Sequence, residues 1–240
     1  GAILPSLVQA LSRLDYPKDR LDIRLLVEAD DEETMAAARR LSPPSPFQVV
    51  SIPVSEPRTK PKACNVGMQG SDADLVVIYD AEDRPDPDQL RKAALAFRRV
   101  PARVACIQAK LGFYNTHQNL LTRWFTAEYA MWFDLCMPAL DGLGAPIPLG
   151  GTSNHFRREV LEAVGAWDEY NVTEDCDLGL RLYVEGWRTR MLDSTTWEQA
   201  CPSLPNWVRQ RSRWVKGYMQ TYFVHMRDPV SLHRRLGWAG

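Results

Sequence analysis

At residues 75–83 the sequence reads LVVIYDAED, a short apolar run that passes directly into three carboxylates. The apolar part is rich in β-branched residues and is typical of a buried strand. In open parallel sheets, ligands bind beyond the carboxyl ends of the strands, and Mg²⁺ or Mn²⁺ prefers carboxylate oxygens. The stretch therefore predicts a metal site at Asp80 and Glu82, while Asp83, Asp86 and Asp88 are candidates for the cap of the next helix. A polar loop that caps the next helix is the alternative interpretation.

Strands and helices alternate on both sides of this stretch. The predicted strands are 21–27, 47–52, 75–79 and 104–109, and the predicted helices are 32–41, 62–69, 86–99, 157–164 and 175–185. Such alternation predicts an α/β fold with a mostly parallel sheet flanked by helices. Leucines at helical spacing predict a further helix at 4–14.

Composition limits the classes of function. The chain has 240 residues, 45% of them apolar, and a net charge of −1. This length fits one α/β domain, and the near-zero charge gives no general attraction to nucleic acid. The cysteines and histidines are too dispersed for a zinc or redox motif. No apolar run reaches the roughly 18 residues that a membrane-spanning helix needs.

A second acidic segment, Thr173-Glu174-Asp175, precedes a predicted helix whose Leu178 and Leu182 share one face. Acidic residues at a helix start commonly cap the helix and interact with its dipole. The functional alternative is that Asp175 accepts the proton of an attacking hydroxyl group as a general base.

A third segment reads QRSRW at residues 210–214. Gln210, Arg213 and Trp214 would project from one helical face. A guanidinium can neutralise a diphosphate leaving group, and an indole can lie against a sugar ring. The alternative is an ordinary amphipathic surface. The aromatic helix predicted at 115–137 likewise fits either a core helix or a surface that faces an acceptor or a membrane.

These segments, taken in order with Lys62 and Asn65, resemble the family 2 glycosyltransferases, in particular the cellulose synthase-like branch with its D-x-D, T-E-D and Q-x-x-R-W motifs. The resemblance covers residues 21–218. It implies a GT-A fold and an inverting, metal-dependent enzyme. The expected reaction moves a hexose from a nucleotide-diphospho-sugar, expected to be a UDP-sugar, to a growing β-linked polysaccharide.

The resemblance also implies the site residues. Asp175 is the expected catalytic base, and Asp80, Glu82 and Asp83 are the expected ligands of Mg²⁺ or Mn²⁺. The expected donor-binding residues are Glu28, Asp30, Lys62, Asn65, Asp80, Gln210, Arg211 and Arg213. The expected acceptor-binding residues are Thr152, Glu174 and Trp214. Two positions depart from the family pattern: the second D of D-x-D is Glu82, with Asp83 beside it, and the acidic pair at residues 28–31 has an ambiguous register.

Members of this family usually carry membrane helices on both sides of the domain. We therefore expect residues 1–240 to be a single catalytic domain that lacks its first strand and belongs to a longer membrane protein. Residues 203–240 are expected to lead towards the membrane, with the domain at its cytoplasmic face.

Three other functions remain open at this point. A non-processive enzyme would add one sugar to a lipid acceptor. A sugar-phosphate nucleotidyltransferase would need a glycine-rich phosphate loop, and neither that nor a Walker or dinucleotide fingerprint is found in the sequence. A non-catalytic sugar-binding module would not need Asp175.

Overall fold

A computed structural model describes residues 2–236 of the chain. Its helices are α1 (Leu4–Ser12), η1 (Lys18–Arg20), α2 (Glu32–Leu41), α3 (Lys60–Met68), α4 (Gln89–Arg99), α5 (Leu120–Ala130), η2 (Met131–Cys136), α6 (Met137–Leu143), α7 (Arg158–Ala163), α8 (Glu174–Val184), α9 (Leu204–His225) and α10 (Pro229–Leu236). Its strands are β1 (Ile23–Glu28), β2 (Phe47–Ile52), β3 (Leu75–Val77), β4 (Arg84–Pro85), β5 (Val104–Phe113), β6 (Asn154–Arg157) and β7 (Arg188–Glu198). The extreme ends of the predicted domain, residues 1 and 237–240, lie outside the described residues.

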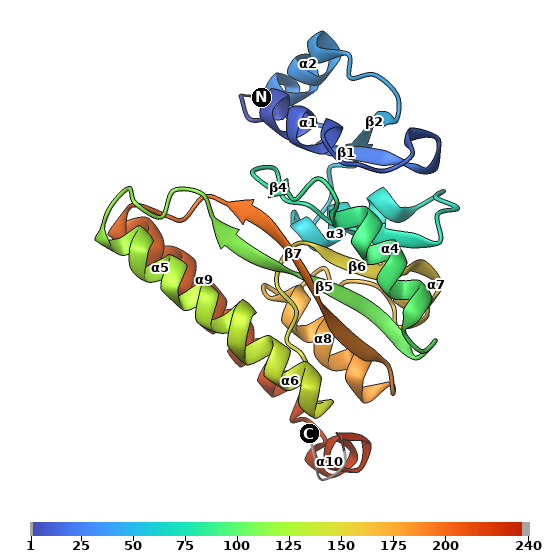
Figure 1. Cartoon of the computed structure of the whole chain (residues 1–240), viewed down its shortest axis with the longest axis vertical. Coiled ribbons are helices and arrows are strands. Elements are labelled where there is room, and N and C mark those ends of the chain that lie inside the picture. The colour runs from blue at the N-terminus through green and yellow to red at the C-terminus, as the bar shows by residue number, and fades with distance from the viewer. Residues whose placement is uncertain (1, 237–240) are drawn as a thin grey trace.

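The N-terminal residues form a layer at the top of Figure 1. Strands β1 and β2 pair in parallel along their full lengths. Leu4 and Val8 of α1, Leu25 of β1 and Ala38 of α2 are buried against one another, which holds both helices to the strands. The predicted order of helix, strand, helix and strand is confirmed here, because the apolar spacing of each element matches its period.

The main sheet has five strands in the order β3-β6-β5-β7-β4. Strands β5 and β7 run parallel, whereas β6 is antiparallel to β3 and β5, and β4 is antiparallel to β7. The α/β class is confirmed. The expectation of a mostly parallel sheet is wrong, because this sheet contains both parallel and antiparallel strand pairs. Strands β6 and β7 were not predicted, since both carry many polar residues and therefore lack the apolar run that marks a buried strand.

Helices cover both faces of strand β5, whose residues 104–109 are all buried. Cys106 faces one cluster that includes Leu178 and Leu182 of α8. The next residue, Ile107, faces a second cluster that includes Phe97 of α4. Successive side chains of a strand point to opposite faces, so β5 joins the two halves of the core.

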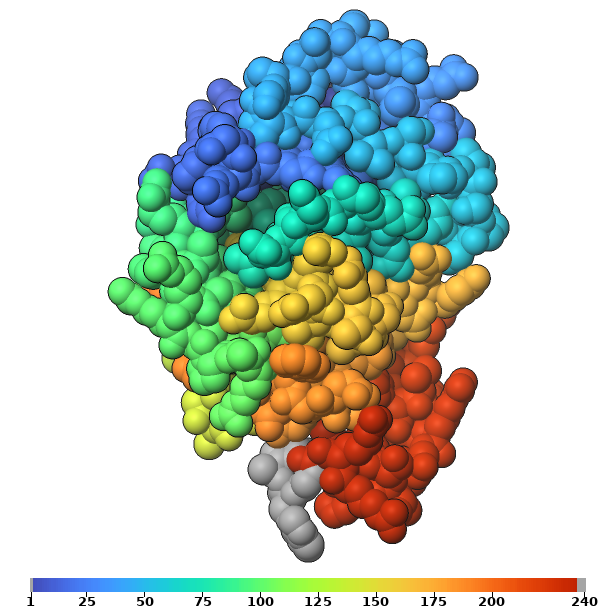
Figure 2. Space-filling model, turned by 90° about the vertical axis from the view of Figure 1, so that its right-hand side faces the viewer, coloured from blue at the N-terminus to red at the C-terminus, as the bar shows by residue number. Residues whose placement is uncertain are grey.

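A pair of long helical segments lies beside strands β5 and β7 of the sheet (Figure 1). One consists of α5, η2 and α6, which replace the single helix expected at 115–137, and the other is α9. Phe125 and Phe133 are buried while Trp124 and Leu135 are exposed, so the first segment has both an inner and an outer apolar face. In the space-filling view, α9 and α10 lie at the end of the molecule opposite the N-terminal layer (Figure 2). Within residues 2–236, no helix has the length and apolar character to cross a bilayer.

Candidate active site

Lys60, at the start of α3, connects its own segment with two distant segments of the chain. Its ammonium donates to the carbonyl of Gly151 at 2.6 Å and forms an ion pair with Asp80. Burial disfavours the charged ammonium, but the negative charges of Asp80 and Glu174 outweigh it and raise the pKa of Lys60. Lys60 therefore stays charged among carboxylates at the carboxyl end of β3.

The acidic turn after β3 uses one of its carboxylates for its own structure. Asp83 is 1% exposed, and its Oδ2 accepts the Asp80 N–H at 2.7 Å and the hydroxyl of Thr152. Burial, and then the charge of Asp80, raises the pKa of Asp83 to about 7. Asp80 and Glu82 remain as the carboxylates of this turn that reach solvent.

The alternative that this acidic loop caps the next helix does not describe the contacts found. Helix α4 has Asp88 as its N-cap, and no side chain makes a capping hydrogen bond there. Asp86 instead accepts the backbone N–H of Thr195 at 2.8 Å, which ties the loop to β7. Asp83 and Asp86 thus hold the loop against the sheet.

Asp175 lies on the first turn of α8 and faces the same region as Lys60. Its Oδ1 accepts the N–H of Cys176 at 2.7 Å. Its Oδ2 lies where a Cβ on Gly151 would be 3.4 Å away, and the same Cβ would be 3.9 Å from Lys60 Nζ. The absence of a side chain at residue 151 therefore leaves room between the carboxylate and the ammonium.

Burial gives the two carboxyl groups on this turn pKa values suited to proton transfer near neutral pH. It raises the pKa of Asp175 to about 6 and, together with the neighbouring Asp175 charge, that of Glu174 to about 7. A base is most effective when its pKa is close to the working pH. Thr173 is the N-cap residue but makes no side-chain capping bond. The Thr173 side chain therefore does not cap the helix, whereas the Asp175 carboxylate accepts the Cys176 N–H of the first turn and so serves the start of the helix as well.

Lys62 and Asn65 are held by protein groups away from this cluster. The Lys62 ammonium is buried and donates to the carbonyls of Pro53 and Ser55 at 2.9 and 2.8 Å. The Asn65 side-chain N–H donates to the carbonyl of Trp167, and the Asn65 amide oxygen accepts the Trp167 N–H. Their assignment to the donor stays a prediction, and the lysine at the cluster is Lys60, which sequence reasoning missed because the KPK segment offers two lysines.

The acidic residues at the end of β1 and just after it, Glu28 and Asp30, lie in the N-terminal layer. Asp30 forms an ion pair with Arg58 at 2.6 Å. Glu28 Oε2 is buried without a hydrogen-bond partner among the described residues. A buried acceptor without a donor costs free energy, so a ligand N–H or O–H group at this position would be favoured.

The residues of the QRSRW segment separate into two groups on α9. Arg211 forms a two-pronged ion pair with Glu128 of α5, and its guanidinium stacks 4.6 Å from the Trp214 ring centroid. Trp214 also packs against Phe125 of α5. Arg211 and Trp214 therefore fasten α9 to α5, while Arg213 is exposed and the Gln210 amide oxygen is buried without a partner in the described part of the chain.

Glu198, at the end of β7, is a further acidic residue near the cluster that the sequence did not single out. Burial, followed by the negative charges of Asp83 and Asp80, raises its pKa well above the usual value. The register places Trp197 opposite Arg84 of β4, so Glu198 follows directly beside the acidic turn. Without a prediction for β7, no sequence signal linked Glu198 to that turn.

The cluster has the oxygen chemistry that a divalent metal ion prefers. Asp80 and Glu82 offer carboxylates at a strand end, and Mg²⁺ is commonly held by one or two carboxylates plus substrate phosphates. Over residues 2–236, no three His, Cys, Asp or Glu side chains form a ready metal-ligand set. A metal here would therefore need ligands from the donor as well.

The sequence profile named Glycosyl transferase family group 2 matches residues 75–240, which is more than half of the chain. The chain belongs to this family. The family assignment and the enzyme class predicted from the sequence are confirmed, whereas the cellulose synthase-like branch stays a prediction.

Curated relatives of the chain are glycosyltransferases. It is 28% identical over 97% of its length to the protein named "Probable glycosyltransferase YdaM" from Bacillus subtilis, and 28% identical over 94% of its length to a beta-monoglucosyldiacylglycerol synthase from Synechocystis sp.. It covers 56% and 47% of those two proteins. The chain thus spans about half the length of the curated relatives it matches.

Solved structures of other proteins share the fold. A mannosyltransferase from Pyrobaculum calidifontis, solved with GDP-Man and Mn²⁺, superposes with a TM-score of 0.75 and 20% identity, over 99% of this chain and 68% of that one. The S. aureus TarS structure with UDP-GlcNAc gives a TM-score of 0.61 and 12% identity, over 83% and 55%. These likenesses confirm the GT-A fold.

Proposed function

We propose that this chain is the catalytic part of an inverting, metal-dependent glycosyltransferase that moves a hexose from a nucleotide-diphospho-sugar to a membrane lipid. The observation that carries the proposal is the convergence of Asp175, Lys60 and Asp80 around the open backbone of Gly151. A base, a fixed cation and a carboxylate at a strand end are the groups that such a transfer requires.

In the proposed reaction the acceptor hydroxyl attacks the anomeric carbon from the face opposite the diphosphate. Asp175 takes the hydroxyl proton as the new carbon–oxygen bond forms and the bond to the diphosphate breaks. One displacement inverts the anomeric carbon, so an α-linked donor gives a β-linked product. Asp80 and Glu82 would hold a Mg²⁺ or Mn²⁺ ion, which would neutralise negative charge on the leaving diphosphate.

Two observations favour a lipid acceptor over a growing polysaccharide. Relatives with similar sequences are beta-monoglucosyldiacylglycerol synthases. The helical pair also presents large exposed apolar side chains on its outer surface, among them Trp124, Leu135, Val215, Met219 and Phe223. Exposed apolar patches of this kind mark protein or membrane contacts.

The charge of the C-terminal helices agrees with a location at a membrane surface. Residues 204–236 contain one acidic side chain, Asp228, and several basic ones. The basic side chains include Arg209, Arg213, Lys216, Arg227, Arg234 and Arg235. Helices that combine basic and apolar side chains bind anionic lipid surfaces. We therefore propose the cytoplasmic face of a membrane as the working place of this domain.

The test is a transfer assay with the full-length protein in vesicles that contain diacylglycerol. Radiolabelled UDP-glucose and GDP-mannose are supplied separately with Mn²⁺, and products are separated by thin-layer chromatography. We expect a single labelled glycolipid with a β-linkage, which the one-bond coupling between the anomeric carbon and its proton identifies for both glucose and mannose. Polymer of increasing length that forms without diacylglycerol would favour the polysaccharide alternative, and an α-linked product would contradict inversion.

A further inference from the structure

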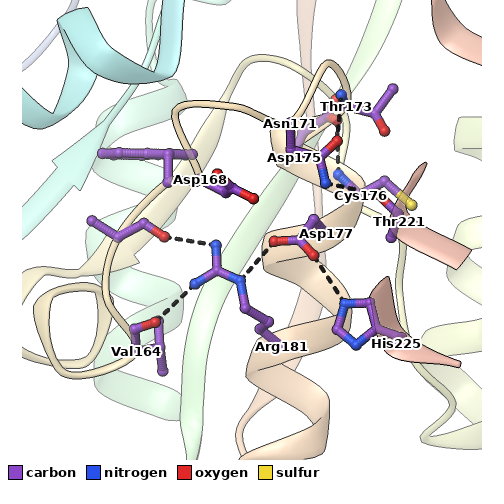
Figure 3. A network of polar contacts seen from close by, with 12 residues as sticks. Val164, Asp168, Asn171, Thr173, Asp175, Cys176, Asp177, Arg181, Thr221 and His225 are labelled. Carbon is purple, nitrogen blue, oxygen red and sulfur yellow. Dashed lines mark hydrogen bonds and ion pairs between the residues drawn. The ribbon is translucent and has the colours of Figure 1, made fainter. Parts of the chain in front are cut away.

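The inner face of α9 contacts the segment that carries Asp175 at two neighbouring points. A Cβ on Gly217 would lie 2.5 Å from Thr173 Cγ2 and 2.9 Å from the Thr173 backbone nitrogen. One turn further along α9, the buried Thr221 hydroxyl accepts the Asn171 side-chain amide at 3.0 Å (Figure 3). Only glycine at 217 allows α9 to approach this closely.

A third contact, two turns beyond Gly217, lies on the other side of Asp175. His225 Nε2 bonds Asp177 Oδ1 at 2.9 Å, and Arg181 Nε bonds Asp177 Oδ2 at 2.7 Å (Figure 3). Asp177 is 3% exposed, and each oxygen of this buried carboxylate accepts one directed hydrogen bond. Arg181 is itself held by the carbonyls of Val164 and Ala166 at 2.8 and 2.7 Å.

These contacts involve residues that precede and follow Asp175 in the sequence. Thr173 precedes it by two residues and Asp177 follows it by two residues, and each is fixed to α9 either directly or through a hydrogen bond. A displacement of α9 would therefore be transmitted to the segment that carries Asp175, because residues on both sides of Asp175 contact α9. The Asp177–His225 hydrogen bond is the contact among them that involves a carboxylate.

We propose that His225 is a positioning residue: through Asp177 it sets the first turn of α8 so that Asp175 Oδ2 faces Gly151 beside Lys60. This inference rests on the proposed role of Asp175 as the base. The bond of His225 is to Asp177, so its effect on the reaction passes through Asp177. The outer side of the same helix carries the exposed apolar residues Val215, Met219 and Phe223, so one helix both presents the lipid-facing surface and orients the base.

The test compares His225→Ala with His225→Gln and with the control His117→Ala, which changes an exposed histidine on the loop before α5. All are made in the full-length protein. Misplacement of a reacting group by about 1 Å can cost on the order of 100-fold in rate, so we expect kcat of His225→Ala to fall about 10- to 100-fold. The KM of the nucleotide sugar should change by less than about three-fold, because donor contacts are untouched.

Glutamine can donate to Asp177 Oδ1 from a position similar to that of His225 Nε2, so His225→Gln should recover most of the lost kcat. His117→Ala should behave as the wild type. A kcat of His225→Ala within about two-fold of the wild type would overturn the proposal. So would a parallel loss of kcat and donor affinity, because that pattern means general loss of structure.

A second measurement does not depend on catalysis. Hydrogen exchange of the backbone amides at 171–177 is compared in the wild type, His225→Ala and Thr221→Val, which keeps the size of the side chain and removes only the hydroxyl group. We expect faster exchange confined to this segment in both variants. Unchanged exchange in both would overturn the proposal. If the exchange result holds while the wild type transfers no sugar, the proposed function fails and the positioning contact stands.

Discussion

Two acidic segments meet near Lys60, and each divides its carboxylates between the site and the fold. After β3, Asp80 pairs with Lys60, whereas Asp83 is buried under Thr152. At the start of α8, Asp175 faces Gly151, whereas Asp177 is buried between Arg181 and His225. Residues two apart on a helix point in nearly opposite directions, so neighbouring carboxylates of one motif have different tasks.

The strongest way to break this comparison is to neutralise each carboxylate of α8 in turn. Asp175→Asn should lower sugar transfer by on the order of 10² to 10⁴, because an amide cannot accept the hydroxyl proton. Asp177→Asn should lower the free energy of unfolding by about 2 kcal/mol, because Arg181 and His225 lose their buried partner charge, and should lower transfer by no more than the roughly 10- to 100-fold expected of His225→Ala. Label incorporation and urea unfolding measure the two effects.

Affinity for the nucleotide diphosphate serves as the control for Asp175→Asn and should stay within a few-fold, since Asp175 is assigned no donor contact. Near-normal transfer by Asp175→Asn would mean that Glu174 and Asp175 only begin the helix. The division of tasks would then be absent from this segment.

The acidic turn gives the second comparison, between Glu82→Ala and Asp83→Ala. Removing the metal with EDTA should weaken binding of the nucleotide diphosphate by about tenfold or more, because the carboxylates would otherwise repel it. Glu82→Ala should reproduce part of this loss without a change in melting temperature. Asp83→Ala should lower the free energy of unfolding by about 2 kcal/mol, since the Asp80 N–H and Thr152 hydroxyl lose their shared acceptor.

Calorimetry with Mn²⁺ or EDTA and thermal unfolding in EDTA provide the measurements. Equal affinity with and without metal would contradict the metal assignment. Loss of metal-dependent binding in Asp83→Ala with unchanged stability would reverse the tasks of the two residues.

The smallest expected effect is an opposite response of activity and stability to pH. Burial raises the pKa of Asp175 from 3.8 to about 6, and that of Glu174 from 4.5 to about 7. Asp175 must be ionised to act as a base, so transfer should fall as the pH drops below about 6. The folded state binds these protons more tightly than the unfolded state, so their contribution to stability is present at low pH and is lost as the pH rises through 6 and 7.

Rate profiles and urea unfolding at pH 5 and pH 8, in EDTA for the unfolding, test this prediction. The double variant Glu174→Gln/Asp175→Asn should show a flatter dependence of stability on pH. A wild-type stability that does not fall between pH 5 and pH 8 relative to that variant would contradict the buried, raised-pKa description of this turn.

Local patterns identified most of the helices and four of the strands, because each of those elements has a clear apolar period. They missed the two-residue strand β4, and also β6 and β7, where residues such as Asn154, Ser194 and Thr196 are buried through hydrogen bonds instead of apolar contacts. That omission also concealed the antiparallel pairings and Glu198. The order of the acidic and QRSRW segments was sufficient for the family, because it needs no knowledge of strand direction.

What the sequence by itself determined is the set of chemical groups: carboxylates after a strand, an acidic helix start, and a basic aromatic helix. The tertiary structure alone decided which members of each set reach the candidate active site beside Gly151. It buried Lys62 and brought Lys60 to Asp80, and it used Arg211 to hold α9 against α5. The physical reason is that the direction of a side chain and the removal of water from it depend on distant segments, such as Glu128, 83 residues from Arg211, and Gly151, 91 residues from Lys60.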